Sequence, residues 1–363
     1  MNNILSYTEE QLDTFRARPF HSVDSLILSW VANFRFPLHA HSLHNWVGLP
    51  LRDLFRAEDF PALFQGLWDP AGSRALLTAL AASPRFREIR LMGYTNRKDP
   101  SQEMQFTAVT FQLRPDLSYV AFGGTDTSLV GWKENFNMTF LSPVPAQTEA
   151  ARYLTQAAAH CSGDLLVGGH SKGGNLAVYA AASVSPDIQT RIRRVYSHDG
   201  PGFPKTFLTS PGYGAIRDRV EKTVPQGSVV GLLLESEACQ VIQSSQRSIL
   251  QHDPFSWTVE GTGFLPAPEL TDEARYWDRT LDDWVDSVEP AQREGFIDAL
   301  YDILTTTHAA SLEDLRDHWQ THLPAILKAA GSLEPDTRTL LLQTLRELGT
   351  AGWRNARASH ETI

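Results

Sequence analysis

The sequence predicts an α/β fold with a central, mostly parallel β-sheet. Two observations carry this prediction. Short apolar segments rich in β-forming residues alternate with helical segments between residues 117 and 234, and such alternation is typical of parallel strands covered by helices. In addition, hydrophobic residues make up 42% of the 363 positions. This content supplies a sizeable core and excludes an intrinsically disordered chain.

The first 85 residues are expected to be helical. Leu26, Ile27 and Trp30 repeat at helical spacing within residues 23–36, and such a stripe belongs to a core more often than to a lid over an active site, which is the second interpretation. The remaining expected elements, in chain order, are helices at 50–55 and 73–82, strands at 86–96, 104–113 and 117–122, a helix at 148–161, a strand at 164–167, a helix at 172–183, a strand at 194–197, a helix at 212–223 and a strand at 228–234.

The strand pattern stops after about residue 266, and the chain divides there. We expect a core at 1–268, with the helical N-terminal segment, and a helical C-terminal extension at 269–363 packed on it. Of the formal net charge of −10, residues 270–363 carry −8. An acidic chain lacks the basic face that a nucleic-acid partner requires. Helices in the extension are expected at 271–287, 290–306, 311–330 and 335–348.

Composition also limits compartment and cofactors. The two cysteines cannot form a disulfide framework or a four-cysteine zinc site. The N-terminus does not read as a signal peptide and no apolar run is long enough for a stable membrane span, so a cytoplasmic protein is expected. Dinucleotide and Walker motifs are absent and no cofactor is expected. His39, His41 and His44 cluster without an acidic or cysteine neighbour, which favours solvated histidines over a metal site.

A nucleophile motif is the strongest chemical signal. Gly169, Ser171 and Gly173 form Gly-x-Ser-x-Gly directly after the apolar strand 164–167 and directly before the Ala-rich helix 172–183. This strand–turn–helix context projects the serine at the carboxyl edge of a sheet in α/β-hydrolases. The alternative is a Gly-rich turn between strand and helix that has a packing role and no catalytic one.

A serine nucleophile needs a base and an acid that orients the base. The usual chain order of serine, acid and histidine favours His252, although a surface histidine is the alternative, and His198 also lies after Ser171. Asp199 follows an expected strand and is the leading acid. The alternatives left open are Glu235, Asp253 and a plain Asp-Gly turn at Asp199.

Two backbone N–H groups are expected to stabilise an oxyanion. The N–H of Lys172 lies at a helix N-terminus just after the nucleophile. Thr125 follows the Gly123-Gly124 pair at the end of an apolar strand, and Asp126 is placed to orient it. A plain Gly-Gly turn explains the same pattern equally well.

These motifs resemble a bacterial lipase-like family of unknown function in the α/β-hydrolase superfamily, distantly similar to class 3 lipases. The resemblance implies Ser171 as nucleophile and His252 as base, and it favours Asp199. Gly123 stands where wider lipases have Arg, whereas the Thr125 position is retained. The residues that carry the resemblance are Phe122–Asp126, Gly131–Met138, Gly169–Asn175, Asp199–Phe203 and Gln251–Asp253.

The sequence thus predicts a serine carboxylester hydrolase that acts on a small-molecule acyl ester. The alternatives are a thioesterase or peptidase using the same triad, and a non-catalytic binding or scaffold protein with this fold. The sequence does not specify the oligomeric state.

Overall fold

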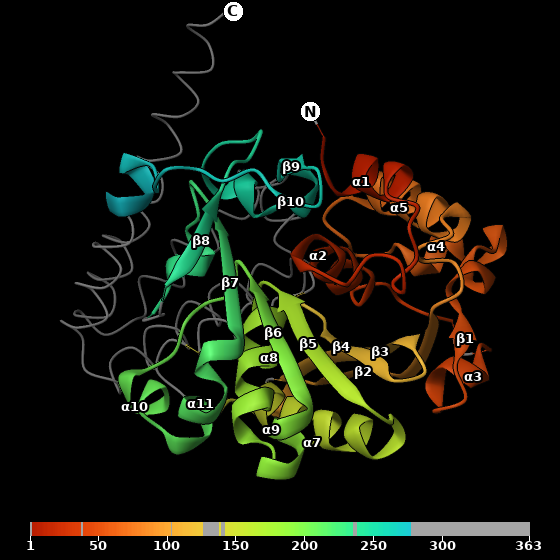
Figure 1. Ribbon diagram of the computed structural model, residues 1–363, viewed down its shortest axis with the longest axis horizontal. Coiled ribbons are helices and arrows are strands. Elements are labelled where there is room, and N and C mark those ends of the chain that lie inside the picture. Colours follow the sequence, from red (N-terminus) through yellow and green to blue (C-terminus); the bar gives the residue numbers. More distant parts are fainter. Residues whose placement is uncertain are drawn as a thin grey trace, which may run out of the picture.

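The computed structural model describes residues 2–37, 39–102, 104–125, 138, 142–234 and 238–276. It confirms the α/β fold with a mostly parallel sheet, shown in Figure 1. Eight strands form one sheet in chain order, and a small hairpin, β9 and β10, lies apart from it. The strands are β1 (Leu49–Pro50), β2 (Arg90–Asp99), β3 (Met104–Arg114), β4 (Leu117–Phe122), β5 (Asp164–His170), β6 (Ile192–His198), β7 (Val220–Pro225), β8 (Cys239–Ile242), β9 (Val259–Glu260) and β10 (Gly263–Phe264).

The direction of the strands changes at β4. Strands β1 to β4 pair antiparallel, whereas β4 to β8 pair parallel. The carboxyl ends of β4 to β8 therefore meet at one edge of the sheet, where open α/β sheets hold their ligand sites.

Helices cover both faces of the sheet, because alternate strand residues enter two separate hydrophobic clusters. Helices α1, α2 and α5 pack on one face, and α7, α8 and α11 pack on the other (Figure 1). Phe111 and Tyr119 enter the first cluster, whereas Phe106 and Phe122 enter the second. The helices are α1 (Ile4–Glu10), α2 (Ser22–Val31), α3 (His41–His44), α4 (Phe60–Leu63), α5 (Pro70–Ala82), α7 (Pro145–His160), α8 (Lys172–Ser183), α9 (Pro186–Arg191), α10 (Lys205–Leu208) and α11 (Pro211–Ile216).

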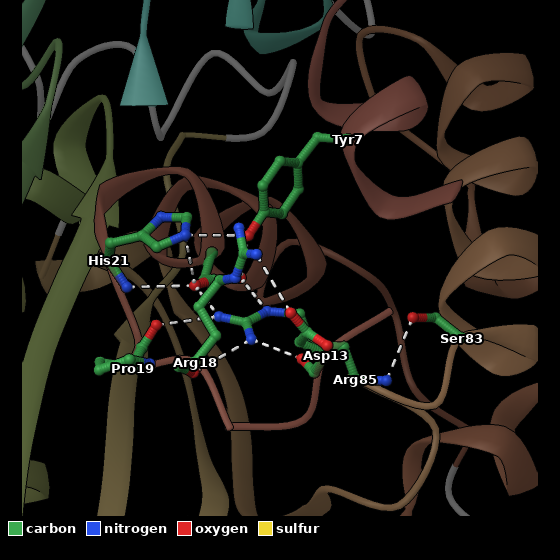
Figure 2. Close-up of polar contacts among 8 residues, drawn as sticks. Tyr7, Asp13, Arg18, Pro19, His21, Ser83 and Arg85 are labelled. Carbon is green, nitrogen blue, oxygen red and sulfur yellow. Dashed lines mark hydrogen bonds and ion pairs between the residues drawn. The ribbon is translucent and has the colours of Figure 1, made fainter. Parts of the chain in front are cut away.

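A buried ion pair fastens the N-terminal segment to this architecture. The Arg85 guanidinium donates to both carboxylate oxygens of Asp24, at 2.8 and 2.6 Å, and neither side chain is exposed. Tyr7 donates to the same carboxylate, and Arg85 also donates to the backbone carbonyls of Asp13 and Pro19 (Figure 2). Because every donor of the cation faces an acceptor, the pair holds α2 and the chain before it in one position.

The apolar stripe of α2 is part of the core, which was the favoured interpretation, and not a lid. Leu26 and Ile27 of α2 are fully buried and Trp30 is nearly so, because α2 lies against β4, β5 and β6. Within the described residues, no helix has the length and apolar character to cross a membrane.

Three expected elements were wrong. In place of the helix expected at 50–55, Pro50 ends β1 and Leu51–Leu54 forms a 3₁₀ helix. The helix expected at 212–223 ends at Ile216, and Val220–Pro225 instead forms β7 beside β6. The strand expected at 228–234 is a loop with a 3₁₀ turn at Val230–Leu232. Its Gly231 lies against an oxygen of Asp199, so this apolar run wraps around a side chain instead of pairing in the sheet.

Residues 272–276 are helical. Residues 277–363 of the expected C-terminal extension lie outside the described residues, as do Asp126 and Glu235.

Candidate active site

Ser171 occupies a strained turn between β5 and α8. Its φ is +58°, a left-handed conformation that non-glycine residues rarely adopt. The flanking glycines have no room for a side chain: a Cβ on Gly169 would lie 2.2 Å from the Gly173 carbonyl, and one on Gly173 would lie 2.2 Å from the Phe122 oxygen. The Ser171 N–H donates to the His198 oxygen at 2.9 Å. The surrounding backbone thus holds the serine in this conformation.

Asp199 and His252 are brought together from distant parts of the chain. The His252 Nδ1 lies 2.6 Å from the Asp199 Oδ2. The other carboxylate oxygen, Oδ1, accepts from the Ser228 hydroxyl at 2.5 Å. Asp199 follows β6, has φ +49° and is 1% exposed. Both carboxylate oxygens are therefore satisfied, and the Oδ2 contact selects the His252 tautomer that carries its proton on Nδ1.

Asp253, an alternative acid, faces the backbone instead. Its carboxylate accepts from the Phe255 N–H at 3.0 Å and caps the 3₁₀ turn Pro254–Ser256. Burial raises the pKa of Asp253.

His170 supports His252, a role that the sequence analysis missed. Its Nε2 lies 2.9 Å from the His252 carbonyl oxygen, and the two rings are 4.6 Å apart. Since a carbonyl only accepts, Nε2 carries the proton. Burial, with the nearby His252 and His198 as smaller causes, holds the pKa of His170 well below its ordinary value. The only signal available was its place directly before Ser171.

The N-terminus also supports the loop that follows His252. The Val259 N–H donates to the Asn2 oxygen at 2.9 Å, and the Asn3 side chain donates to the Phe255 oxygen at 2.9 Å. The Trp257 indole donates to the Gln251 oxygen at 2.8 Å. These contacts fix the loop on both sides of the histidine.

His198, the other histidine near the nucleophile, belongs to the core. Its Nε2 lies 2.9 Å from the Ser25 hydroxyl, which also meets the Tyr119 hydroxyl. Burial lowers the pKa of His198 to about 3, so the ring is neutral.

The loop after β4 lies against Ser171. A Cβ on Gly124 would lie 3.5 Å from the Ser171 Cβ and 3.1 Å from the His170 oxygen. Gly123 cannot hold a longer side chain, because a Cβ there would lie 2.9 Å from the Thr107 Cβ. The Thr125 hydroxyl oxygen is buried and has no hydrogen-bond partner among the described residues. Gly124 of this loop therefore lies beside Ser171, and the next residue carries a buried hydroxyl.

Lys172 and Asn175 open helix α8. The Asn175 amide donates to the Pro201 and Gly202 carbonyls and accepts from Gln147 at 2.8 Å. Asn175 thereby ties the helix start to the loop that follows Asp199.

The histidines near α3 show no metal geometry. His39 lies 3.4 Å from the Asp59 carboxylate and His44 lies 3.1 Å from the Pro37 oxygen. No group of three or more metal-ligating side chains occurs in the described parts of the chain.

The sheet order, the strained serine turn and the paired Asp199 and His252 define a hydrolase-like α/β protein. The chain belongs to the Mbeg1-like family, whose model matches residues 80–302. The lipase-like relationship predicted from the motifs is therefore confirmed. Among curated proteins, none matches the sequence.

Two solved structures are similar at 13% identity. One is the crystal structure of M37 lipase, with 54% of this chain and 68% of that chain covered and a TM-score of 0.33. The other is the native Rhizomucor miehei lipase propeptide complex, with 63% and 76% covered and a TM-score of 0.35.

Proposed function

We propose that the protein is a serine hydrolase that cleaves carboxylic esters of small molecules. One observation carries the proposal: His252 bonds the buried carboxylate of Asp199 while its ring lies against His170, the residue before Ser171. The turn of Ser171 and the pair of His252 and Asp199 at the carboxyl edge of the parallel strands support the proposal, because acyl-transfer enzymes hold a nucleophile, a base and an acid at such an edge.

In the proposed reaction, the Ser171 hydroxyl attacks the ester carbonyl and passes its proton to His252 Nε2. The Asp199 carboxylate keeps the other proton on Nδ1 and stabilises the imidazolium that forms. The N–H groups of Lys172 and Thr125 stabilise the oxyanion. His252 then protonates the leaving alcohol, the acyl group remains on Ser171, and water activated by His252 releases the acid.

The Thr125 hydroxyl, which has no partner among the described residues, supports this assignment. A buried hydroxyl without a partner is unfavourable in a folded protein, and such groups are expected where a ligand completes the hydrogen bond. The oxygen of a bound acyl group is an acceptor that both the hydroxyl and the N–H of Thr125 are suited to bind.

A labelling experiment tests the proposal. The purified protein is treated with a fluorophosphonate probe, and p-nitrophenyl esters of two to twelve acyl carbons are tested for turnover. We expect labelling and turnover that Ser171→Ala abolishes and that Ser162→Ala, on an exposed turn, leaves intact. A wild-type chain that neither labels nor turns over any ester or thioester would support a non-catalytic binding role instead.

A further inference from the structure

The side chain of Lys172 is buried beside the nucleophile turn. It is only 1% exposed, and its ammonium donates to the Gln105 carbonyl at 2.6 Å and to the Gln105 side-chain oxygen at 3.2 Å. A buried lysine is rare, because an ammonium removed from water is unfavourable unless acceptors replace the water. Two of its acceptors belong to one residue of β3, so the cation holds that residue against the start of α8.

Gln105 lies at the level of the Thr125 loop. Strands β3 and β4 pair antiparallel with Ala108 opposite Phe122, and the Gly123 N–H donates to the Thr107 oxygen at 2.8 Å. Gln105 lies two residues before Thr107 on the same strand. The Gln105 amide also reaches the Gly124 oxygen at 3.4 Å.

The N–H of Gly124 is held by Asn33, which follows the end of α2. The Gly124 N–H donates to the Asn33 side-chain oxygen at 2.7 Å. The Asn33 amide donates in turn to the Ser29 and Trp30 carbonyls at 3.2 Å. Gly124 is therefore held through its N–H by Asn33 and through its carbonyl oxygen by Gln105, and that oxygen belongs to the peptide unit whose N–H is that of Thr125.

We propose that Lys172 is a positioning residue for the oxyanion hole, acting through Gln105 on the Gly124–Thr125 peptide. Its backbone N–H is one oxyanion donor, and its side chain fixes the strand end that carries the other. One residue thus sets the separation between the two donors. This inference deepens the proposed function and rests on it.

The role has a kinetic signature. Donors at the right separation stabilise charge that develops only in the transition state, so their displacement lowers kcat and leaves KM nearly unchanged. The loss of a whole oxyanion donor lowers kcat by about 10²–10³-fold. A shifted donor retains part of this effect, and we expect a fall of about 10- to 100-fold.

Three variants test the inference. Lys172→Met keeps the chain length and removes the ammonium. Gln105→Met removes the side-chain contacts and keeps the carbonyl that accepts from Lys172. Lys222→Met is the matched control, because Lys222 is also a largely buried lysine (8% exposed) but lies on β7. Each variant is assayed for kcat and KM on a p-nitrophenyl ester and for inhibition by a trifluoromethyl ketone, which forms a tetrahedral adduct with the serine.

We expect kcat and trifluoromethyl ketone affinity to fall together in Lys172→Met, less so in Gln105→Met, and to stay within threefold of wild type in Lys222→Met. KM is expected to change less than threefold throughout. Wild-type kcat in a folded Lys172→Met protein, or an equal loss in Lys222→Met, would overturn the inference. If Lys172→Met does not fold, Gln105→Met decides: wild-type kcat and ketone affinity there count against the inference.

A second measurement separates this inference from the proposed function. Amide hydrogen exchange at Gly124 reports its bond to Asn33 and needs no substrate. Faster exchange at Gly124 in Lys172→Met or Gln105→Met, with wild-type exchange in Lys222→Met, supports the positioning role even if the wild-type protein turns over no ester. Unchanged exchange in both variants rejects it.

Discussion

Asp199→Asn removes the charge opposite His252 and keeps the shape of the side chain. In the wild-type protein the carboxylate accepts from His252 Nδ1 at 2.6 Å and from Ser228 at 2.5 Å. An amide has one acceptor oxygen for these two donors. If that oxygen stays with Ser228, the amide N–H₂ faces Nδ1 and drives the proton to Nε2, where His252 can no longer accept from Ser171.

The size of the effect follows from this geometry. With N and O in contact, the centres of an imidazolium and a carboxylate lie about 4 Å apart, and two unit charges at that distance interact by about 4 kcal/mol at an effective dielectric constant of about 20. That energy corresponds to about a 10³-fold fall in kcat. The wrong tautomer raises the expected loss to as much as about 10⁴-fold.

The assay measures kcat/KM with the best p-nitrophenyl ester from pH 6 to 9. Asp253→Asn is the matched control, because Asp253 adjoins His252 in sequence but binds the Phe255 N–H instead. We expect a loss of about 10³-fold or more in Asp199→Asn and less than tenfold in Asp253→Asn. The reverse order would refute the assignment of the acid.

Three further predictions concern buried charge and the histidines. The pKa of His198 is lowered to about 3 in the folded protein, so the unfolded chain binds the extra proton below about pH 6.5. This group should therefore lower the free energy of unfolding by about 3 kcal/mol between pH 7 and 4 in urea titrations. If His198→Gln loses as much stability over this pH range as the wild-type protein does, the prediction is wrong. Arg85→Met should lower the free energy of unfolding by about 3–5 kcal/mol, whereas Arg114→Met, at an exposed ion pair, should lower it by less than about 1 kcal/mol. Equal urea midpoints for the two variants would contradict the stabilising role of the buried pair of Arg85 and Asp24. His170→Phe should lower kcat/KM by about tenfold, because the donor to the His252 carbonyl is lost, whereas His170→Gln keeps a donor there and should lose less. Equal kcat/KM values for the two variants would contradict a role for this hydrogen bond.

The parts predicted well from sequence are those determined by local chemistry. The strand that begins at Asp164 and the helix Lys172–Ser183 have the expected positions. Backbone atoms close in sequence and on the neighbouring strand leave no room for a side chain at Gly169 or Gly173. The turn around Ser171 could therefore be predicted from the motif alone. Strand β4 also has its expected bounds.

The parts predicted poorly depend on distant contacts. The run 228–234 is apolar enough for a strand, but Gly231 and Ser228 close around Asp199, which lies about thirty positions earlier. Strands β1 and β8 are only two and four residues long and carry no periodic pattern. Asn33 and Gln105 hold the Gly124 peptide from elements far away in the sequence, and neither stands in a motif.

The hydrogen bond from the Asn3 side chain to the Phe255 carbonyl spans 252 positions of the chain. Contacts of such long separation form late in folding, because the entropy of closing a large loop must be overcome first. During synthesis the turn that carries Ser171 can form while the His252 loop and its N-terminal support are still apart. The loop that carries His252 therefore gains its N-terminal support only when these two distant segments of the chain meet.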